Sequence, residues 1–191
     1  MKLLRAVIGV SVGLWILVGL AYPLAMTGIS QVIFPYQANG SQVKLNGKVV
    51  ASAHVGQYFD QAQYFWGRPS ATTPPYNPEA STPSNLGPTN KLLIQHIKAR
   101  VALLLKTTPG LTVNQIPASL VESSGSGLDP DITVQSALIQ IPRIAKATGI
   151  SRATLTKIVK QHIIGPQLGI FGRSHVNVVD LNLAVFKILH P

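Results

Sequence analysis

The residue types that most often carry enzymatic chemistry are few and scattered in this chain. The sequence has 191 residues and six carboxylates, at Asp60, Glu79, Glu122, Asp129, Asp131 and Asp180. A general acid–base pair needs two carboxylates at one bond, and a turn would direct Asp129 and Asp131 to different sides. No HExxH zinc spacing or GxSxG nucleophile elbow occurs, and the absence of cysteine excludes thiol catalysis and Cys-ligated zinc. We therefore predict no catalytic residue and no metal site, and keep a membrane-anchored enzyme only as an alternative.

A run of small residues forms a second candidate site, at Ser124, Gly125, Ser126 and Gly127. Backbone N–H groups of such a run can bind an anion, and a predicted helix follows within one or two turns. No Lys-Ser/Thr pair closes the run, so it is not a P-loop. The functional interpretation is a nucleotide or anion loop. The structural one, which we favour, is a tight turn with glycine at positive φ.

Residues 143–163 have the outline of a helix–turn–helix, in a chain with a formal net charge of +10. Ser151 begins the second predicted helix, which carries Arg152, Lys157 and Lys160. In a basic protein this arrangement indicates DNA binding. The same helix pair is also common as ordinary packing, so a DNA-binding protein is kept as an alternative.

All of these candidate sites follow one element that must position them, an uncharged apolar run over residues 6–26. As a helix rising about 1.5 Å per residue, it would reach about 30 Å, the thickness of the hydrocarbon core of a bilayer. It is longer than the apolar core of a cleavable signal peptide, and no A-x-A site follows it. The sequence therefore predicts a transmembrane helix.

The flanking charges predict the orientation of this helix. Lys2 and Arg5 precede the run, and no further Lys or Arg occurs before Lys44. The positive-inside rule then places residues 1–5 in the cytoplasm and residues 27–191 outside. We expect a single-pass protein of the plasma (inner) membrane, in contact with membrane lipid and not with nucleic acid.

The apolar run also carries small residues on one face, at Gly9, Ser11 and Gly13. Small residues four apart let a second helix approach closely, which is a common way for helices to associate in lipid. We expect this face to pack against a helix of a partner, as in a subunit of a complex.

Residues 27–191 are long enough for one domain, and we predict an α+β fold with a helix-rich, extracytoplasmic arrangement. Asn46-Gly47 indicates a hairpin. We expect helices over 91–106, 134–148 with a break at Pro142, and 152–163, capped by Asn90, Thr133 or Asp131, and Ser151 respectively. We expect 117–121 to be extended, 67–90 to be a long Pro-rich loop, and 176–189 to be either helix or strand.

An aromatic cluster precedes the Pro-rich loop, at Tyr64, Phe65 and Trp66, with Arg68 close by. These residue types are common anchors of protein–protein interfaces. We expect them to lie at a subunit interface or to order the long loop, and an ordinary core cluster explains the aromatic residues equally well.

Several motifs, in order along nearly the whole chain, resemble the C subunit of the Kdp potassium-transporting ATPase. They are YPLAMTGISQVIFP (22–35), ANGS (38–41), YFWGRPSAT (64–72), YN (76–77), SNLGP (84–88), SGSGLDP (124–130), QIPRIAKATG (140–149) and VNVVDLNLAV (176–185). YFWGRPSAT and SGSGLDP are the most specific of these.

The resemblance implies a non-catalytic accessory subunit of a high-affinity, ATP-driven potassium uptake complex. Its partners would be a potassium-selecting membrane subunit and a P-type ATPase subunit, which hydrolyses ATP. It implies no cofactor of the chain's own, with ATP reached through the complex. The family is also described as a catalytic chaperone that raises the ATP affinity of the pump subunit, with the Gly/Ser loop at the nucleotide. That role conflicts with the exterior location that the charges predict for 124–127, and the charge rule carries more weight.

Overall fold

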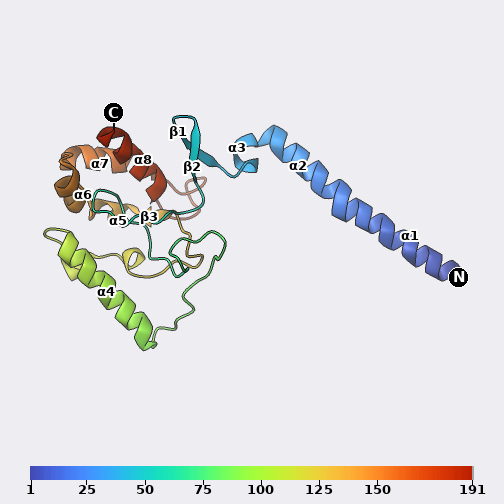
Figure 1. Cartoon of the computed structure of the whole chain (residues 1–191), viewed down its shortest axis with the longest axis horizontal. Coiled ribbons are helices and arrows are strands. Elements are labelled where there is room, and N and C mark those ends of the chain that lie inside the picture. The colour runs from blue at the N-terminus through green and yellow to red at the C-terminus, as the bar shows by residue number, and fades with distance from the viewer. Residues whose placement is uncertain (191) are drawn as a thin grey trace. The chain divides into compact units, whose positions relative to one another are not determined.

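The computed structural model describes residues 1–190 and divides the chain into two compact units, Met1–Val50 and a second that begins at Ala51. Each is a separate body of helices and short strands (Figure 1). The mixed helix and strand content confirms the predicted α+β class.

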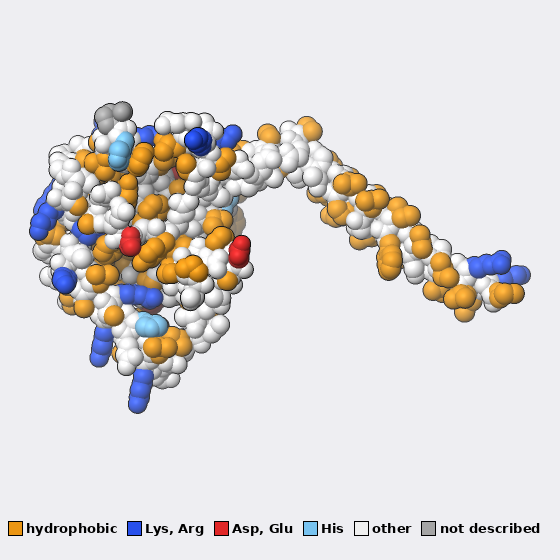
Figure 2. Space-filling view, viewed as in Figure 1, with side chains coloured by type: hydrophobic (Ala, Val, Ile, Leu, Met, Phe, Trp, Pro, Cys, Tyr) orange, Lys and Arg blue, Asp and Glu red, His pale blue; other side chains and the backbone are white. Residues whose placement is uncertain are grey.

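The first unit is dominated by one apolar helix, built from α1 (Lys2–Ile16), a π-helical turn η1 (Leu17–Ala21) and α2 (Tyr22–Ile33). The helix has 32 residues, and its most apolar 18-residue window has a mean hydropathy of 2.2 with no residue buried, so it is long and apolar enough to cross a membrane. Figure 2 shows apolar side chains along its length. The π turn has a local cause, since Pro23 has no N–H to donate and Tyr22 N–H bonds instead to the Leu17 carbonyl five residues back. The predicted span 6–26 lies within this helix.

The rest of the first unit is a short helix and a hairpin. Helix α3 (Pro35–Ala38) leads to β1 (Gln42–Leu45) and β2 (Lys48–Ser52), which pair with each other. Asn46 and Gly47 join the strands with φ angles of 49° and 79°, which confirms the predicted hairpin.

The second unit contains five α-helices, α4 to α8, and a small sheet. The helices are α4 (Lys91–Thr107), α5 (Val134–Leu138), α6 (Ile141–Thr148), α7 (Arg152–Gln161) and α8 (Val178–Leu189). The strands are β3 (Asp131–Thr133), β4 (Ile163–Ile164) and β5 (His175–Asn177), in the antiparallel order β3-β5-β4 with Ile132 and Ile163 both opposite Val176. Figure 1 shows α6, α7 and α8 gathered together, with α4 along another edge of the same unit.

The helix starts follow the predicted caps. Asn90, Thr133 and Ser151 each accept a hydrogen bond from a backbone N–H in the first turn of α4, α5 and α7. The predicted break near Pro142 is present, because α5 ends at Leu138 and α6 begins at Ile141 with the proline in its first turn.

Two regions differ from what the sequence predicts, residues 117–121 and the last segment. Residues 117–121 were expected to be extended, which is wrong: Pro117 is extended, but a 3-10 turn, η3 (Ala118–Leu120), follows it and is closed by the Leu120 N–H donating to the Pro117 carbonyl. A second 3-10 turn, η2 (Val113–Gln115), follows α4. The last segment is both alternatives in succession, since strand β5 passes directly into helix α8 at the capping residue Asn177.

The main core lies between the sheet and α5 to α8, and Phe65 inserts into it from the segment 57–70, which turns at residues 61–64 and otherwise has no helix or strand. This segment has no strand beside it, and buried side-chain amides take the place of a strand. Asn182 Oδ1 accepts the Phe65 N–H at 2.7 Å, and its Nδ2 donates to the Phe65 carbonyl at 2.9 Å. Gln140 pairs in the same way with Trp66, at 2.8 and 3.1 Å.

We predict that Asn182→Ala destabilises the chain by about 2 to 4 kcal/mol, because it leaves the backbone N–H and C=O of the fully buried Phe65 unpaired. The free energy of unfolding of the detergent-solubilised full chain, measured by denaturant titration and circular dichroism, tests this. Asn114→Ala, at an exposed asparagine, is the matched control and should change stability by less than about 0.5 kcal/mol. Equal unfolding midpoints for the two variants would contradict the prediction.

Candidate functional site

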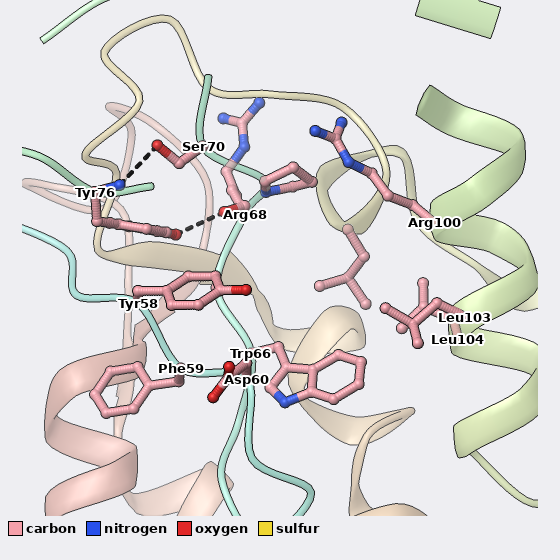
Figure 3. Close-up of a pocket in the computed structure, with 13 residues that line it drawn as sticks. Tyr58, Phe59, Asp60, Trp66, Arg68, Ser70, Tyr76, Arg100, Leu103 and Leu104 are labelled. Atoms are coloured by element: carbon pink, nitrogen blue, oxygen red, sulfur yellow. Dashed lines mark hydrogen bonds between the residues drawn. The ribbon is translucent and has the colours of Figure 1, made fainter. Parts of the chain in front are cut away.

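A pocket of about 390 Å³ opens between the segment 57–70, Tyr76 and helix α4 (Figure 3). Its walls are mainly aromatic and aliphatic, with two arginines among them. The principal lining side chains are Tyr58, Phe59, Trp66, Tyr76, Leu103, Leu104, Leu120, Arg68 and Arg100. The pocket therefore lies between α4 and a segment that ends more than 20 residues before α4 begins.

The structure separates the four residues of the predicted aromatic and arginine cluster. Phe65 is fully buried in the main core, with 0% of its surface exposed, and Tyr64 packs at the edge of that core. Trp66 packs against the smaller core cluster of Leu104, Leu120 and Val121 and lines the pocket. The core alternative therefore holds for Phe65, which has no surface to offer a partner. A subunit interface at Tyr64, Trp66 and Arg68 stays a prediction.

Arg68 orders the loops around it. Its Nη1 forms an ion pair with Asp129 Oδ2 at 3.0 Å, and its Nη2 donates to the Ser123 carbonyl at 3.3 Å. Its own carbonyl accepts the Tyr76 hydroxyl at 2.6 Å. Burial raises the pKa of Tyr76 well above its usual range, so this phenol stays a hydrogen-bond donor at physiological pH.

Trp66 is held by a buried arginine that stacks on its ring. The Arg143 Cζ lies 3.8 Å from the ring centroid of Trp66, and its Nη1 donates to the carbonyls of Ala62 and Tyr64 at 2.8 and 3.0 Å. Burial lowers the pKa of Arg143 to about 10. The ring and the carbonyls take the place of a carboxylate for this cation.

The Gly/Ser loop is a tight turn whose polar groups are largely committed within the chain. Ser124 Oγ accepts the Gly127 N–H at 2.9 Å, and Gly127 has a φ of 70°. The Ser124 N–H itself donates to the Pro69 carbonyl, and the Ser126 carbonyl accepts from Ser81 Oγ at 3.0 Å. The favoured turn interpretation therefore agrees with the geometry. A nucleotide or anion contact at Ser124, Gly125, Ser126 and Gly127 stays a prediction.

The candidate helix–turn–helix is a packed helix pair, with Gly149 in the left-handed conformation between α6 and α7. Leu155, Ile158 and Val159 of α7 are buried in the core, and Arg143 is buried under Trp66. On the face drawn in Figure 2, Lys and Arg side chains are spread over the second unit rather than gathered in a stripe. This distribution differs from the continuous basic surface of a typical DNA-binding domain.

No cluster of three or more His, Cys, Asp or Glu side chains that could hold a metal ion occurs within residues 1–190. The Asp131 and His175 side chains approach each other to 3.9 Å. Burial raises the pKa of Asp131, against the opposing effect of His175.

Comparison with known proteins decides the family. The family model described as "K+-transporting ATPase, c chain" matches residues 4–187. The chain belongs to the KdpC family. A potassium-transporting ATPase KdpC subunit of Sorangium cellulosum is 50% identical over 170 residues, 88% of this chain and 89% of the relative. Those of Methylibium petroleiphilum and Paraburkholderia phytofirmans are 46% and 47% identical over 96% and 99% of this chain, and 96% and 98% of their own length.

The two most specific motifs of the KdpC resemblance touch each other in the folded chain. YFWGRPSAT supplies Arg68 and Ser70, and SGSGLDP supplies Asp129 and Gly127. Besides the Arg68–Asp129 ion pair, the Ser70 hydroxyl donates to the Gly127 carbonyl at 2.7 Å. The two motifs therefore form one structural unit at the rim of the pocket.

Sequence reasoning missed four residues on which this site depends: Gln140, Arg143, Tyr76 and Arg100. A signal for Arg143 and Gln140 was present, because both stand beside the apolar positions Ile141 and Ile144, on the inner face of α6. A polar side chain at a core-facing position of a helix indicates a buried hydrogen-bond partner. Nothing local marked Tyr76 or Arg100, whose partners are set by loop packing.

We predict that Gly127→Ala destabilises the chain by about 2 kcal/mol or more, since Gly127 has positive φ and an added Cβ would meet Thr72 and the Thr82 carbonyl. Gly125→Ala is the matched control in the same loop, because no atom lies within 4 Å of its added Cβ. Thermal unfolding of the full chain in detergent measures both. A loss of stability in Gly125→Ala as large as that in Gly127→Ala would refute this account of the turn.

Proposed function

We propose that this chain is the C subunit of an ATP-driven potassium uptake complex and performs no catalysis itself. Its role is to assemble with, and stabilise, a potassium-selecting membrane subunit and a P-type ATPase subunit. The observation that carries this proposal is the family match over residues 4–187, together with relatives named potassium-transporting ATPase KdpC subunit. The comparisons give no support to the DNA-binding or anchored-enzyme alternatives.

The exposed helix supports an assembly role. No residue of its most apolar window is buried within this chain, and added Cβ atoms at Gly9 and Gly13 would meet nothing within 4 Å. A helix with an unfilled small-residue face, Gly9, Ser11 and Gly13, suits close packing against a second membrane helix. We propose that this face contacts a partner subunit, and that the rest of the helix contacts lipid.

The charges of Lys2 and Arg5 support an orientation with residues 1–5 on the cytoplasmic side of a bacterial inner membrane and residues 27–191 on the outer side. In this orientation the loop at Ser124–Gly127 cannot reach cytosolic ATP. Any influence of the chain on ATP affinity, as in the chaperone proposal for the family, would have to pass through the partner subunits.

Membrane-helix packing predicts a defined loss of assembly. The test uses cells that lack this subunit and depend on the complex for growth at micromolar potassium. The wild-type chain should restore their growth. The Gly9→Leu/Gly13→Leu double variant should neither restore growth nor co-purify with the partner subunits. The bulky side chains prevent close approach of the helices. Gly19→Leu, equally open within this chain, is the control and should retain both.

Two results would count against different parts of this proposal. Growth without the chain would contradict the accessory function itself. Full co-purification of the double variant would contradict only the packing face.

The absence of cysteine allows a direct test of orientation. Thr89→Cys and Ser174→Cys place single thiols at exposed positions of the second unit, and Leu3→Cys places one before the span. A membrane-impermeant maleimide should label the first two in intact cells, and Leu3→Cys only after permeabilisation. The opposite pattern would reverse the topology and allow direct contact with ATP.

A further inference from the structure

Two arginines at the pocket, Arg68 and Arg100, meet at Ser123, but only Arg68 has a carboxylate partner. Arg68 donates to the Ser123 carbonyl at 3.3 Å, and Arg100 lies 3.5 Å from the Ser123 hydroxyl, so both guanidinium groups converge on one residue. Asp129 is paired with Arg68 at 3.0 Å. Within residues 1–190, no carboxylate lies at ion-pair distance from Arg100. Arg100 is therefore the pocket cation that has no carboxylate partner within the described residues.

Arg100 is a half-buried cation with incomplete partners. Its Nη1 donates to the Val121 carbonyl at 2.8 Å, and its other contacts are the two long ones to Ser123. Burial lowers its pKa, which shows that its charged form is disfavoured here relative to water. The adjacent Arg68 Nε is buried and has no hydrogen-bond partner. Such a desolvated charge is stabilised when an anion binds beside it.

Below the arginines the pocket is apolar. Figure 3 shows Arg68 and Arg100 side by side at one end, with Leu103 and Leu104 along one wall and Trp66 at the opposite end. Tyr58 directs its hydroxyl toward the space between them.

The shape and charge restrict the chemistry of a ligand. A guanidinium fork matches the two oxygens of a carboxylate, and aromatic and leucine walls suit a ring or a short aliphatic chain. A pocket of about 390 Å³ is in the range of small-molecule sites. Asp60 lies on the side of the pocket away from the two arginines, which disfavours a second negative charge on the body of the ligand.

We propose that this pocket binds a small organic monocarboxylate with an aromatic or aliphatic body. The carboxylate pairs with Arg100, and the body packs between Trp66 and the leucines of α4. This site is separate from the assembly function proposed above. A bound ligand bridges α4 and the extended segment, two elements that the long Pro-rich loop connects.

Trp66 provides the reporter for a binding test. The chain has two tryptophans, so Trp15→Phe leaves Trp66 as the single tryptophan, which can be excited selectively at the red edge of its absorption, in the detergent-solubilised full chain. Titration with 3-phenylpropionate should change its fluorescence to saturation. The neutral 3-phenylpropanamide should bind at least about tenfold more weakly, because it lacks the charge that pairs with Arg100. Inorganic phosphate should bind more weakly than 3-phenylpropionate because it has no apolar body.

Variants separate recognition from folding. Arg100→Gln should weaken binding by about tenfold or more, whereas Lys98→Gln, an exposed cation on the same helix, should leave it unchanged. Leu103→Phe narrows the pocket with Arg100 in place and should also weaken binding, while circular dichroism confirms that each variant is folded. Equal affinity of Arg100→Gln and Lys98→Gln, or of the acid and the amide, would overturn the proposal, as would the absence of saturable binding.

The assembled complex provides the last arm of the test. Saturable binding of 3-phenylpropionate to the Trp66 pocket in the complex, detected by competition with a radiolabelled sample and lost in Arg100→Gln, supports a free small molecule as the ligand. Binding to the isolated chain that disappears in the complex would overturn it, because another subunit would then fill the pocket.

Discussion

The fold of the second unit depends on how one extended segment satisfies its backbone without a neighbouring strand. Buried N–H and C=O groups must be paired, and a sheet normally supplies the partners. Here Asn182, Gln140 and Arg143 supply them from two helices, α8 and α6. The Asn182 and Gln140 amides each bond to both backbone groups of one residue, and the two residues, Phe65 and Trp66, are consecutive. These bonds fix the position of the segment along the two helices.

The pocket is a consequence of this arrangement. Because Phe65 and Trp66 are locked by the amides, their side chains point to opposite sides, Phe65 into the main core and Trp66 toward α4. Arg68 follows two residues later on the Trp66 side, where Asp129 fixes it. The pocket walls are therefore positioned by contacts that lie outside the pocket.

The scarcity of acidic residues shapes the electrostatics of the whole molecule. With 16 Lys and Arg and only six Asp and Glu, most arginines must find other partners. Arg143 uses carbonyls and a tryptophan ring, and Arg68 has Asp129 as its counter-ion. Arg100 has carbonyl and hydroxyl contacts alone, and so it is the pocket arginine whose charge is least compensated.

The sequence by itself determined the features that depend on neighbouring residues. These are the apolar helix, the Asn46-Gly47 hairpin, the caps of α4, α5 and α7, and the break before Pro142, because length, turn chemistry and capping act within a few positions. Its motifs were also specific enough to indicate the family. Tertiary structure alone decided that Phe65 lies in the core and that Arg68 and Arg100 meet at Ser123. It also decided that the Gly/Ser loop donates the Gly127 N–H to Ser124 Oγ and the Ser124 N–H to the Pro69 carbonyl. Apart from the bond within the turn, the cited hydrogen bonds join residues 23 to 55 positions apart, and local propensity carries no information about which distant partners a packed core brings together.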